Sequence, residues 1–198
     1  PQPEFSVSYN IGFFVHIEYL CSAGLHDIGM FVVVTRLGLL QAVGAGSRLR
    51  ANVAYIEQAE PLGRAHAFMV ADDYLGDSPF VMYLGDNMLE DRIAPFVEEY
   101  LKGGWDCQVL LKRVNNWQQL GVAELADDGR VKRLVEKPTT FVSDLALVGI
   151  YMFNSRIFEA VHNIKPSWRN EYEITDAIQY LLDHGYHVHP RVLEGWWI

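Results

Sequence analysis

The sequence has little cysteine and no long uninterrupted apolar run. Its two cysteines, Cys21 and Cys107, are far apart and form no Cys-x-x-Cys pair, which excludes a disulfide framework and argues against a cysteine-based zinc site. A reducing, cytoplasmic setting is therefore expected. The apolar stretch over residues 11–25 is broken by His16 and Glu18 and is shorter than a bilayer requires. We expect neither a membrane span nor a targeting signal.

Positive charge is also scarce. Lys and Arg number 16 against 25 Asp and Glu, which gives a formal net charge of −9. This balance argues against a nucleic-acid partner, because phosphate backbones are bound by clustered Lys and Arg. It still allows a single nucleotide, which a few local cations and a metal ion can hold. Half of the 198 residues are hydrophobic, enough for one domain with a substantial core.

Apolar runs of strand length alternate with helical patterns in the first half. The predicted strands cover residues 28–34, 53–57 and 80–84, and the predicted helices cover 36–43, 63–76 and 93–104. This alternation predicts βαβ units. The second half has strands over 107–114, 121–137 and 146–154, with a hairpin turn at 127–130, then helices near 155–163 and 173–185 and a last strand at 186–193. We predict one three-layer α/β domain over residues 1–198 with a mainly parallel mixed sheet.

The stretch GAGSRLR, residues 44–50, has the glycines and arginines of a phosphate-binding loop. Such a loop follows a strand and opens a helix, so that backbone amides and the helix dipole face the anion. Here a predicted helix precedes it and a predicted strand follows, so the order is reversed. We interpret it as a solvated helix-to-strand turn.

The segment FVMYLGDN, residues 80–87, ends a buried strand at Gly85 and places Asp86 where the chain leaves the sheet. Ligands of open α/β sheets bind at the carboxyl ends of strands, and a carboxylate there suits Mg²⁺, which bridges substrate phosphates. The equally probable alternative is an Asp-Asn turn, or a cap for the helix that begins near Asp91.

Two further segments carry candidate ligands. RLVEKP, residues 133–138, delivers Glu136 and Lys137 side by side, and both reach one ligand only if the strand end twists; the alternative is a surface charge pair. EQAEPLGRAHA, residues 57–67, offers Gln58 to a base edge and Gly63 for close backbone approach to a flat ligand. An ordinary strand–turn–helix junction explains that segment equally well.

Taken together, the segments resemble the sugar-nucleotide pyrophosphorylases, in particular the glucose-1-phosphate thymidylyltransferases. The matching blocks, in chain order, are YIEQAEPLGRAHA, FVMYLGDN, LGVAEL, RLVEKP, DLALVGIYMF, EYEITDAIQYL and EGWW. The resemblance covers the chain from about Ile28 to the C-terminus. The resemblance implies a Rossmann-like nucleotide-diphospho-sugar transferase fold and a reaction that joins dTTP to glucose 1-phosphate and releases pyrophosphate, with Mg²⁺ as cofactor.

The resemblance also assigns roles to residues of the site. It implies that Asp86 binds Mg²⁺, that Lys137 contacts the sugar phosphate, and that Tyr151 closes that side. The base would be framed by Gln58, Pro61 and Gly63, and the hexose would be lined by Gly121, Glu136 and Leu147. Glu173 lies in a matching block, where the alternative is an acidic residue at a helix start.

The chain departs from the family pattern in several places. Arg64 replaces an aliphatic residue, and Gln2 stands where the catalytic lysine is expected. The sequence shows neither the glycine-rich triphosphate loop nor the second metal-binding Asp that follows the GWW block. We therefore expect this chain to be close to inactive. The alternatives are a non-catalytic sugar-phosphate- or nucleotide-binding relative and a uridylyltransferase that uses UTP; a homo-oligomer is compatible with either.

Overall fold

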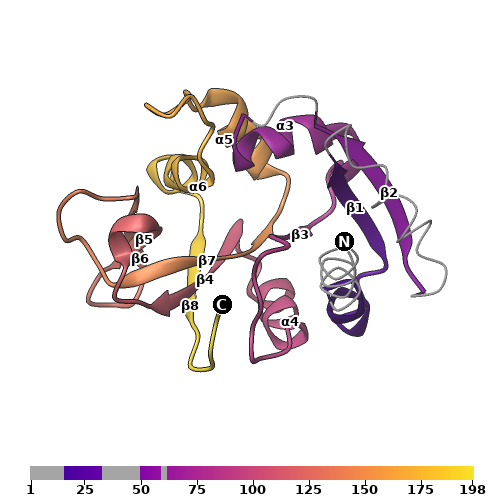
Figure 1. Ribbon diagram of the computed structural model, residues 1–198, viewed down its shortest axis with the longest axis horizontal. Coiled ribbons are helices and arrows are strands. Elements are labelled where there is room, and N and C mark those ends of the chain that lie inside the picture. The colour runs from indigo at the N-terminus through magenta and orange to yellow at the C-terminus, as the bar shows by residue number, and fades with distance from the viewer. Residues whose placement is uncertain (1–15, 33–49, 59–61) are drawn as a thin grey trace, which may run out of the picture. The chain divides into compact units, whose positions relative to one another are not determined.

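The computed structural model describes residues 16–32, 50–58 and 62–198 (Figure 1). The chain divides into two compact units, residues 1–60 with 92–98 and residues 61–91 with 99–198. The strands are β1 (Asp27–Val32), β2 (Asn52–Glu57), β3 (Phe80–Tyr83), β4 (Cys107–Arg113), β5 (Gly121–Leu125), β6 (Val131–Glu136), β7 (Leu145–Phe153) and β8 (Val188–Val192). The helices are α3 (Arg64–Leu75), α4 (Ala94–Gly103), α5 (Arg156–Asn163), α6 (Ile174–Asp183) and the 3-10 helix η2 (Trp117–Gln119).

The first unit contains a parallel strand pair. β1 and β2 run in parallel register from Asp27 opposite Asn52 to Val32 opposite Glu57, as the predicted βαβ pattern requires. Residues 16–22 form a helix, and its Ile17 packs with Met30 and Ala51 in a small core. The helix predicted at 36–43 and the GAGSRLR stretch up to residue 49 lie outside the described residues.

The second unit is built on a six-stranded mixed sheet in the order β6-β5-β7-β4-β8, with β3 also paired to β7. β4 and β8 are parallel, whereas β7 runs antiparallel to β3, β4 and β5. The α/β class and the mixed sheet are confirmed. The mainly parallel character is not, for the pairings of β7 and of the β5–β6 hairpin are antiparallel. Apolar runs identify strands but carry no information on their direction.

Both faces of the central strands β4 and β7 of this sheet are buried. Alternate residues of β4 and β7, among them Val109, Leu111 and Phe153, join α3, α5 and α6 in one apolar cluster, and Figure 1 shows these three helices over the sheet. On the opposite face, Leu110 and Ile150 have no exposed surface. A sheet covered on both faces agrees with the predicted three-layer arrangement.

The hairpin between β5 and β6 forms at the predicted turn. Gly129 has φ +83°, its N–H donates to the carbonyl of Ala126, and Ala126 N–H donates to the carbonyl of Arg130. Glycine adopts positive φ at little cost, so the DDGR segment fixes the register. Among the described residues, no helix has both the length and the apolar character needed to cross a bilayer.

Shortening the core side chain of α6 should destabilise this unit. Ile178 is fully buried in the main cluster, so Ile178→Ala is expected to lower the free energy of unfolding by about 2–5 kcal/mol. Leu101→Ala, at a position 61% exposed on α4, should change it by less than about 0.5 kcal/mol. Urea unfolding of both variants measures this, and equal losses would show that α6 does not anchor the core.

Candidate functional site

The predicted site residues of the second unit gather along β7. Leu147, Gly149 and Tyr151 alternate along the strand and therefore face the same side of the sheet. Leu147 lies next to Gly121, and Gly149 lies next to Asn87. One strand face therefore joins the predicted hexose residues to the loop that carries Asp86.

Gly121, Glu136 and Leu147, which the resemblance assigns to the hexose, lie together. Gly121 and Glu136 are direct partners in the β5–β6 ladder. A Cβ atom added at Gly121 would lie 2.9 Å from Glu136 Oε2, 3.1 Å from Leu147 Cδ1 and 2.6 Å from Thr175 Oγ1. Any side chain at position 121 would fill the space between these three groups, so this position needs glycine.

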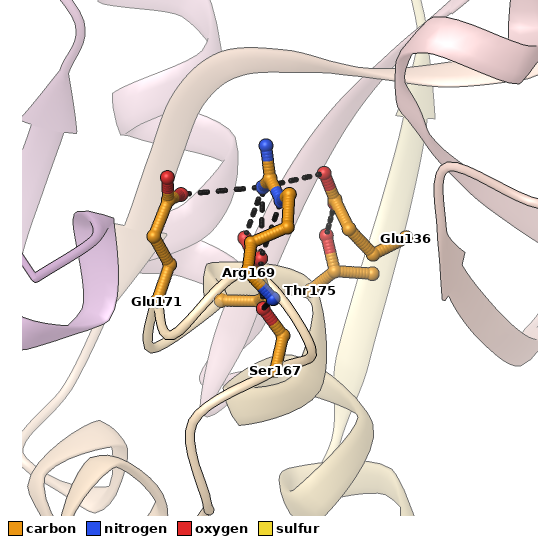
Figure 2. Close-up of polar contacts among 6 residues, drawn as sticks. Glu136, Ser167, Arg169, Glu171 and Thr175 are labelled. Atoms are coloured by element: carbon orange, nitrogen blue, oxygen red, sulfur yellow. Dashed lines mark hydrogen bonds and ion pairs between the residues drawn. The ribbon is translucent and has the colours of Figure 1, made fainter.

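Thr175 fixes one oxygen of the Glu136 carboxylate. Its hydroxyl donates to Glu136 Oε2 at 2.6 Å, and Thr175 is 1% exposed at the start of α6. The other carboxylate oxygen, Oε1, lies 3.7 Å from Arg169 Nη2. Figure 2 shows Glu136 and Thr175 on one side of Arg169 and Glu171 on the other.

Arg169 is held mainly by Glu173. Its Nη2 lies 2.8 Å and 2.9 Å from the two Glu173 oxygens, and Ser167 Oγ also donates to Glu173 at 2.8 Å. The Glu171 carboxylate lies 3.2 Å from the same Nη2. Hydrogen bonds to Glu173 raise the pKa of the Arg169 guanidinium further, so this group stays charged beside Glu136.

Glu173 stands at a helix start, as the alternative for its block predicts, and it also contacts a residue beside Glu136. It is the N-cap residue of α6, but its side chain makes no capping hydrogen bond. The side chain is buried and points its carboxylate to Arg169 instead. The acid at the helix start therefore orders the 167–173 loop next to Glu136.

The end of β6 twists at Lys137. The strand ends at Glu136, and Lys137 has φ +40°, outside the extended region. Its N–H donates to the carbonyl of Leu120 at 3.1 Å, and its side chain is exposed while Pro138 is buried. The strict alternation of strand side chains therefore stops between Glu136 and Lys137, which is the condition for both to reach one ligand.

Asp86 sits in a loop that Asn87 anchors to β7. Asn87 Oδ1 accepts the N–H of Gly149 at 2.9 Å and the indole N–H of Trp197 at 2.7 Å, and Asn87 Nδ2 donates to Asp86 Oδ1 at 2.7 Å. A Cβ atom at Gly149 would lie 2.5 Å from Asn87 Nδ2. The exposed Asp86 carboxylate is thus attached to the central strand through one buried amide.

The next residue on this face of β7 is Tyr151, whose electrostatic environment includes both Glu136 and Asp86. Burial raises the pKa of its phenol well above the ordinary value; the charge of Arg64 partly offsets this, and the charges of Glu136 and Asp86 add to it. Tyr151 is 1% exposed. The phenol is therefore neutral at physiological pH and lies within electrostatic reach of both carboxylates.

The residues expected to frame the base come from different parts of the chain. Gln58 follows β2 in the first unit and is half-buried, and Pro61 lies outside the described residues. Gly63 precedes α3 with φ +101°, and a Cβ there would lie 2.6 Å from the carbonyl oxygen and 2.7 Å from the nitrogen of Tyr172. The chain's own backbone thus approaches Gly63 closely, which gives this glycine a structural role.

The fit of Mg²⁺ depends on Asp86. In the described ranges, no group of three or more His, Cys, Asp or Glu side chains could hold a metal ion. Asp86 offers an exposed carboxylate with one oxygen already oriented by Asn87. Mg²⁺ is commonly held by one or two carboxylates together with phosphate oxygens and water, so an ion bound with the substrate fits this site and an ion bound by protein alone does not.

Sequence reasoning missed three residues of this site. Thr175 and Asn87 lie inside matching blocks, but nothing in the sequence distinguishes their side chains from ordinary helix and turn residues. Arg169 lies in the loop between α5 and α6, where the sequence has no periodic pattern. Each is identified only by its contacts in three dimensions.

The close approach at Gly63 predicts a specific loss of stability. Gly63→Ala combines positive-φ strain with a clash against the Tyr172 backbone and should lower the free energy of unfolding by at least about 2 kcal/mol. Gly104→Ala is the matched control, because Gly104 has φ +64° but nothing within 4 Å of its added Cβ; strain alone should cost about 1 kcal/mol. Equal losses in urea unfolding would contradict the close contact.

The acid in the first turn of α6 predicts a pH dependence. Burial raises the pKa of Asp176 above 3.8, and the charges of Glu173 and Glu136 add to the shift. The folded chain therefore binds this proton more tightly than the unfolded chain, so stability is lost as the pH rises above 3.8. Asp176→Asn should raise the free energy of unfolding at neutral pH by roughly 0.5 kcal/mol, since the group is partly solvent-screened. The gain should vanish at low pH, and an equal gain at both pH values would contradict this account.

Comparison with known proteins agrees with this architecture. The family model described as nucleotidyl transferase matches residues 13–198. A glucose-1-phosphate thymidylyltransferase from Streptomyces antibioticus is 47% identical over 185 residues, which are 93% of this chain and 52% of the relative. The chain therefore spans about half the length of the curated relatives that it matches.

Two solved structures are similar throughout. A Bacillus anthracis protein assigned as a glucose-1-phosphate thymidylyltransferase, in complex with sucrose, has a TM-score of 0.84 and 30% identity, over 91% of this chain and 73% of that one. A UDP-glucose pyrophosphorylase in complex with UDP-glucose has a TM-score of 0.80 over 94% of this chain and 80% of that one; at 21% identity it supports the fold alone. The predicted Rossmann-like nucleotide-sugar transferase fold is confirmed. The chain belongs to the nucleotidyl transferase family.

Proposed function

We propose that this protein joins dTTP to glucose 1-phosphate and releases dTDP-glucose and pyrophosphate, and that residues 1–198 form one nucleotidyltransferase domain. The observation that carries the proposal is the convergence of Gly121, Glu136 and Leu147 beside the twisted strand end at Lys137. The 47% identity to a glucose-1-phosphate thymidylyltransferase supports the choice of substrates.

The reaction is an in-line displacement at phosphorus. A phosphate oxygen of glucose 1-phosphate attacks the α-phosphorus of the nucleotide, a new P–O bond forms, and the bond to the bridging oxygen of the β-phosphate breaks. Pyrophosphate leaves with that electron pair. Catalysis then consists mainly of positioning the two phosphates and stabilising their charge.

The hexose is bound by Glu136 and its neighbours. The Glu136 carboxylate accepts hydrogen bonds from sugar hydroxyls, with Thr175 holding one oxygen in place. Gly121 leaves the space that a side chain would fill, and Leu147 supplies an apolar wall. Tyr151, which burial keeps neutral, closes this side without adding charge.

Two cationic side chains bind the phosphate of the sugar. The Lys137 ammonium contacts the sugar phosphate, and charge-assisted hydrogen bonds of this kind are among the strong ones in proteins. The guanidinium of Arg169, 3.7 Å from Glu136, adds a second positive charge nearby. Arg169 itself lies among the carboxylates of Glu136, Glu171 and Glu173.

The proposal assigns the nucleotide to residues that precede β5 in the chain. The resemblance assigns contacts with the base to Gln58, Pro61 and Gly63, and the Asp86 carboxylate would hold Mg²⁺. An Mg²⁺ ion held there would offset the charge that develops on the phosphates during transfer. Asn87 keeps Asp86 in position for this through its amide.

The proposal also places the protein in the cytoplasm, with small-molecule substrates. Both cysteines are free thiols, which agrees with a reducing compartment. The proposal includes assembly into a homo-oligomer, in which Trp168 and Phe141, 90% and 66% exposed, would offer aromatic side chains of the kind enriched at interfaces.

Pyrophosphate release tests the proposal. The protein expressed from its complete reading frame is assayed with glucose 1-phosphate, Mg²⁺ and either dTTP or UTP. We expect turnover with dTTP to exceed turnover with UTP, and Asp86→Asn to lower it by a factor of about 100 or more. Asp128→Asn, on the exposed hairpin turn, should leave it unchanged. No release with either nucleotide would overturn the proposal, and faster release with UTP would reassign the base.

Lys137 should discriminate the sugar phosphate from the free sugar. Lys137→Ala removes a cation near the phosphate and should weaken glucose 1-phosphate binding by about 1.5–3 kcal/mol. Binding of glucose, which has no phosphate, should change much less. Lys132→Ala is the control, because Lys132 lies within β6, is 60% exposed and pairs with Glu124. Calorimetric titration with both ligands decides, and equal losses would mean that Lys137 supports the strand and not the ligand.

A further inference from the structure

The side chain of Lys112 holds three successive backbone carbonyls. Its Nζ donates to the carbonyl oxygens of Leu193, Glu194 and Gly195 at 3.3, 2.8 and 2.5 Å. Lys112 lies on β4, opposite Ala146 of the central strand β7. An ammonium has three donors that rotate freely about its stem. One side chain can therefore donate a hydrogen bond to each of the three carbonyls in the turn that follows β8.

This turn determines where the C-terminal residues run. After it, the chain pairs with the loop that follows Asp86: Met88 and Ile198 exchange both backbone hydrogen bonds, at 2.9 and 3.1 Å, and Glu90 N–H donates to the carbonyl of Trp196 at 3.0 Å. A Cβ atom at Gly195 would lie 2.9 Å from Glu90 Oε2. The two segments are therefore closely apposed.

Two side-chain hydrogen bonds connect this C-terminal segment to the proposed metal ligand, Asp86. The Trp197 indole N–H donates to Asn87 Oδ1 at 2.7 Å, and Asn87 Nδ2 donates to Asp86 Oδ1 at 2.7 Å. Asn87 is 6% exposed, so the indole supplies a buried hydrogen bond that water does not readily replace. A continuous set of contacts therefore leads from Lys112 through residues 193–198 to the Asp86 carboxylate.

Removing the ammonium would leave three carbonyl dipoles converging on one point. Such an arrangement is electrostatically unfavourable, and the turn would relax towards water. The C-terminal segment would then shift relative to residues 88–90, and the indole of Trp197 would lose its fixed distance to Asn87. Sub-ångström displacement of a ligand group is enough to impair a phosphoryl-transfer site.

We propose that Lys112 is a positioning residue for Asp86, acting through the carbonyls of residues 193–195 and the Trp197–Asn87 hydrogen bond. This inference rests on the proposed role of Asp86 as the ligand of Mg²⁺. It assigns to Lys112 no contact with substrate or metal.

The test uses three variants of the protein expressed from its complete reading frame. Lys112→Met removes the ammonium and keeps an unbranched stem, Lys112→Arg restores donors, and Lys132→Met removes an exposed lysine of β6. Mn²⁺ affinity is measured by electron paramagnetic resonance with dTTP present, the Trp197 indole N–H is followed by NMR without metal, and kcat and KM are measured with glucose 1-phosphate and Mg²⁺.

We expect Lys112→Met to shift the indole resonance, to weaken Mn²⁺ binding about tenfold and to lower kcat by a similar factor, while the KM for glucose 1-phosphate stays within twofold. Lys112→Arg should recover most of the Mn²⁺ affinity, and Lys132→Met should match the unmodified protein. A purely structural role would alter thermal unfolding and the indole signal but leave Mn²⁺ affinity and kcat unchanged, and that result would overturn the inference.

Mn²⁺ binding to the unmodified protein and to Asp86→Asn distinguishes a failure of this inference from a failure of the proposed function. If Asp86→Asn does not abolish Mn²⁺ binding, or if no Mn²⁺ binds at all, Asp86 is not the metal ligand. That result removes the proposed function itself. Mn²⁺ binding that depends on Asp86 but not on Lys112 would leave the proposed function standing and remove only the role of Lys112.

Discussion

The site depends on the burial and pairing of one strand, β7. All nine of its residues are buried, and it pairs with β3, β4 and β5. β3 leads into the Asp86 loop, and β5 brings Gly121 and, through the hairpin, Glu136. Because β7 runs antiparallel to these partners, the parts of the site that they carry meet along its length. A shift of β7 by one residue would turn Leu147, Gly149 and Tyr151 to the other face.

Small residues on this frame decide how closely the parts approach. Gly149 allows Asn87 to contact the strand, and Gly121 leaves the space that Glu136, Leu147 and Thr175 surround. Gly195 does the same for the segment that pairs with residues 88–90. At each of these positions two segments lie so close together that an added Cβ atom would clash with the neighbouring segment. Glycine is therefore needed for the close approach of the segments.

Much of the fold could be predicted from the sequence, because its segments have strong local patterns. The runs that become β2, β3 and β4 and the helical patterns of α3 and α6 were placed to within a few residues, and the DDGR turn fixed a hairpin. Strand direction could not be predicted, since the apolar pattern of β7 suits parallel and antiparallel pairing equally. Within the site, Gly121, Glu136 and Leu147 are brought together as expected. Arg169, Asn87 and Lys112 were not foreseeable, because their roles arise from contacts with residues distant in the chain.

A crystal structure with bound dTDP-glucose would show whether β7 brings the residues that bind the hexose and those that bind its phosphates side by side. The account predicts that the glucosyl hydroxyls contact Glu136, with the ring against Gly121 and Leu147. It also predicts that the diphosphate lies between Lys137 and the Asp86 loop. A glucosyl group bound away from Gly121 and Glu136, with the carboxylate of Glu136 still occupied only by Thr175 and Arg169, would contradict it.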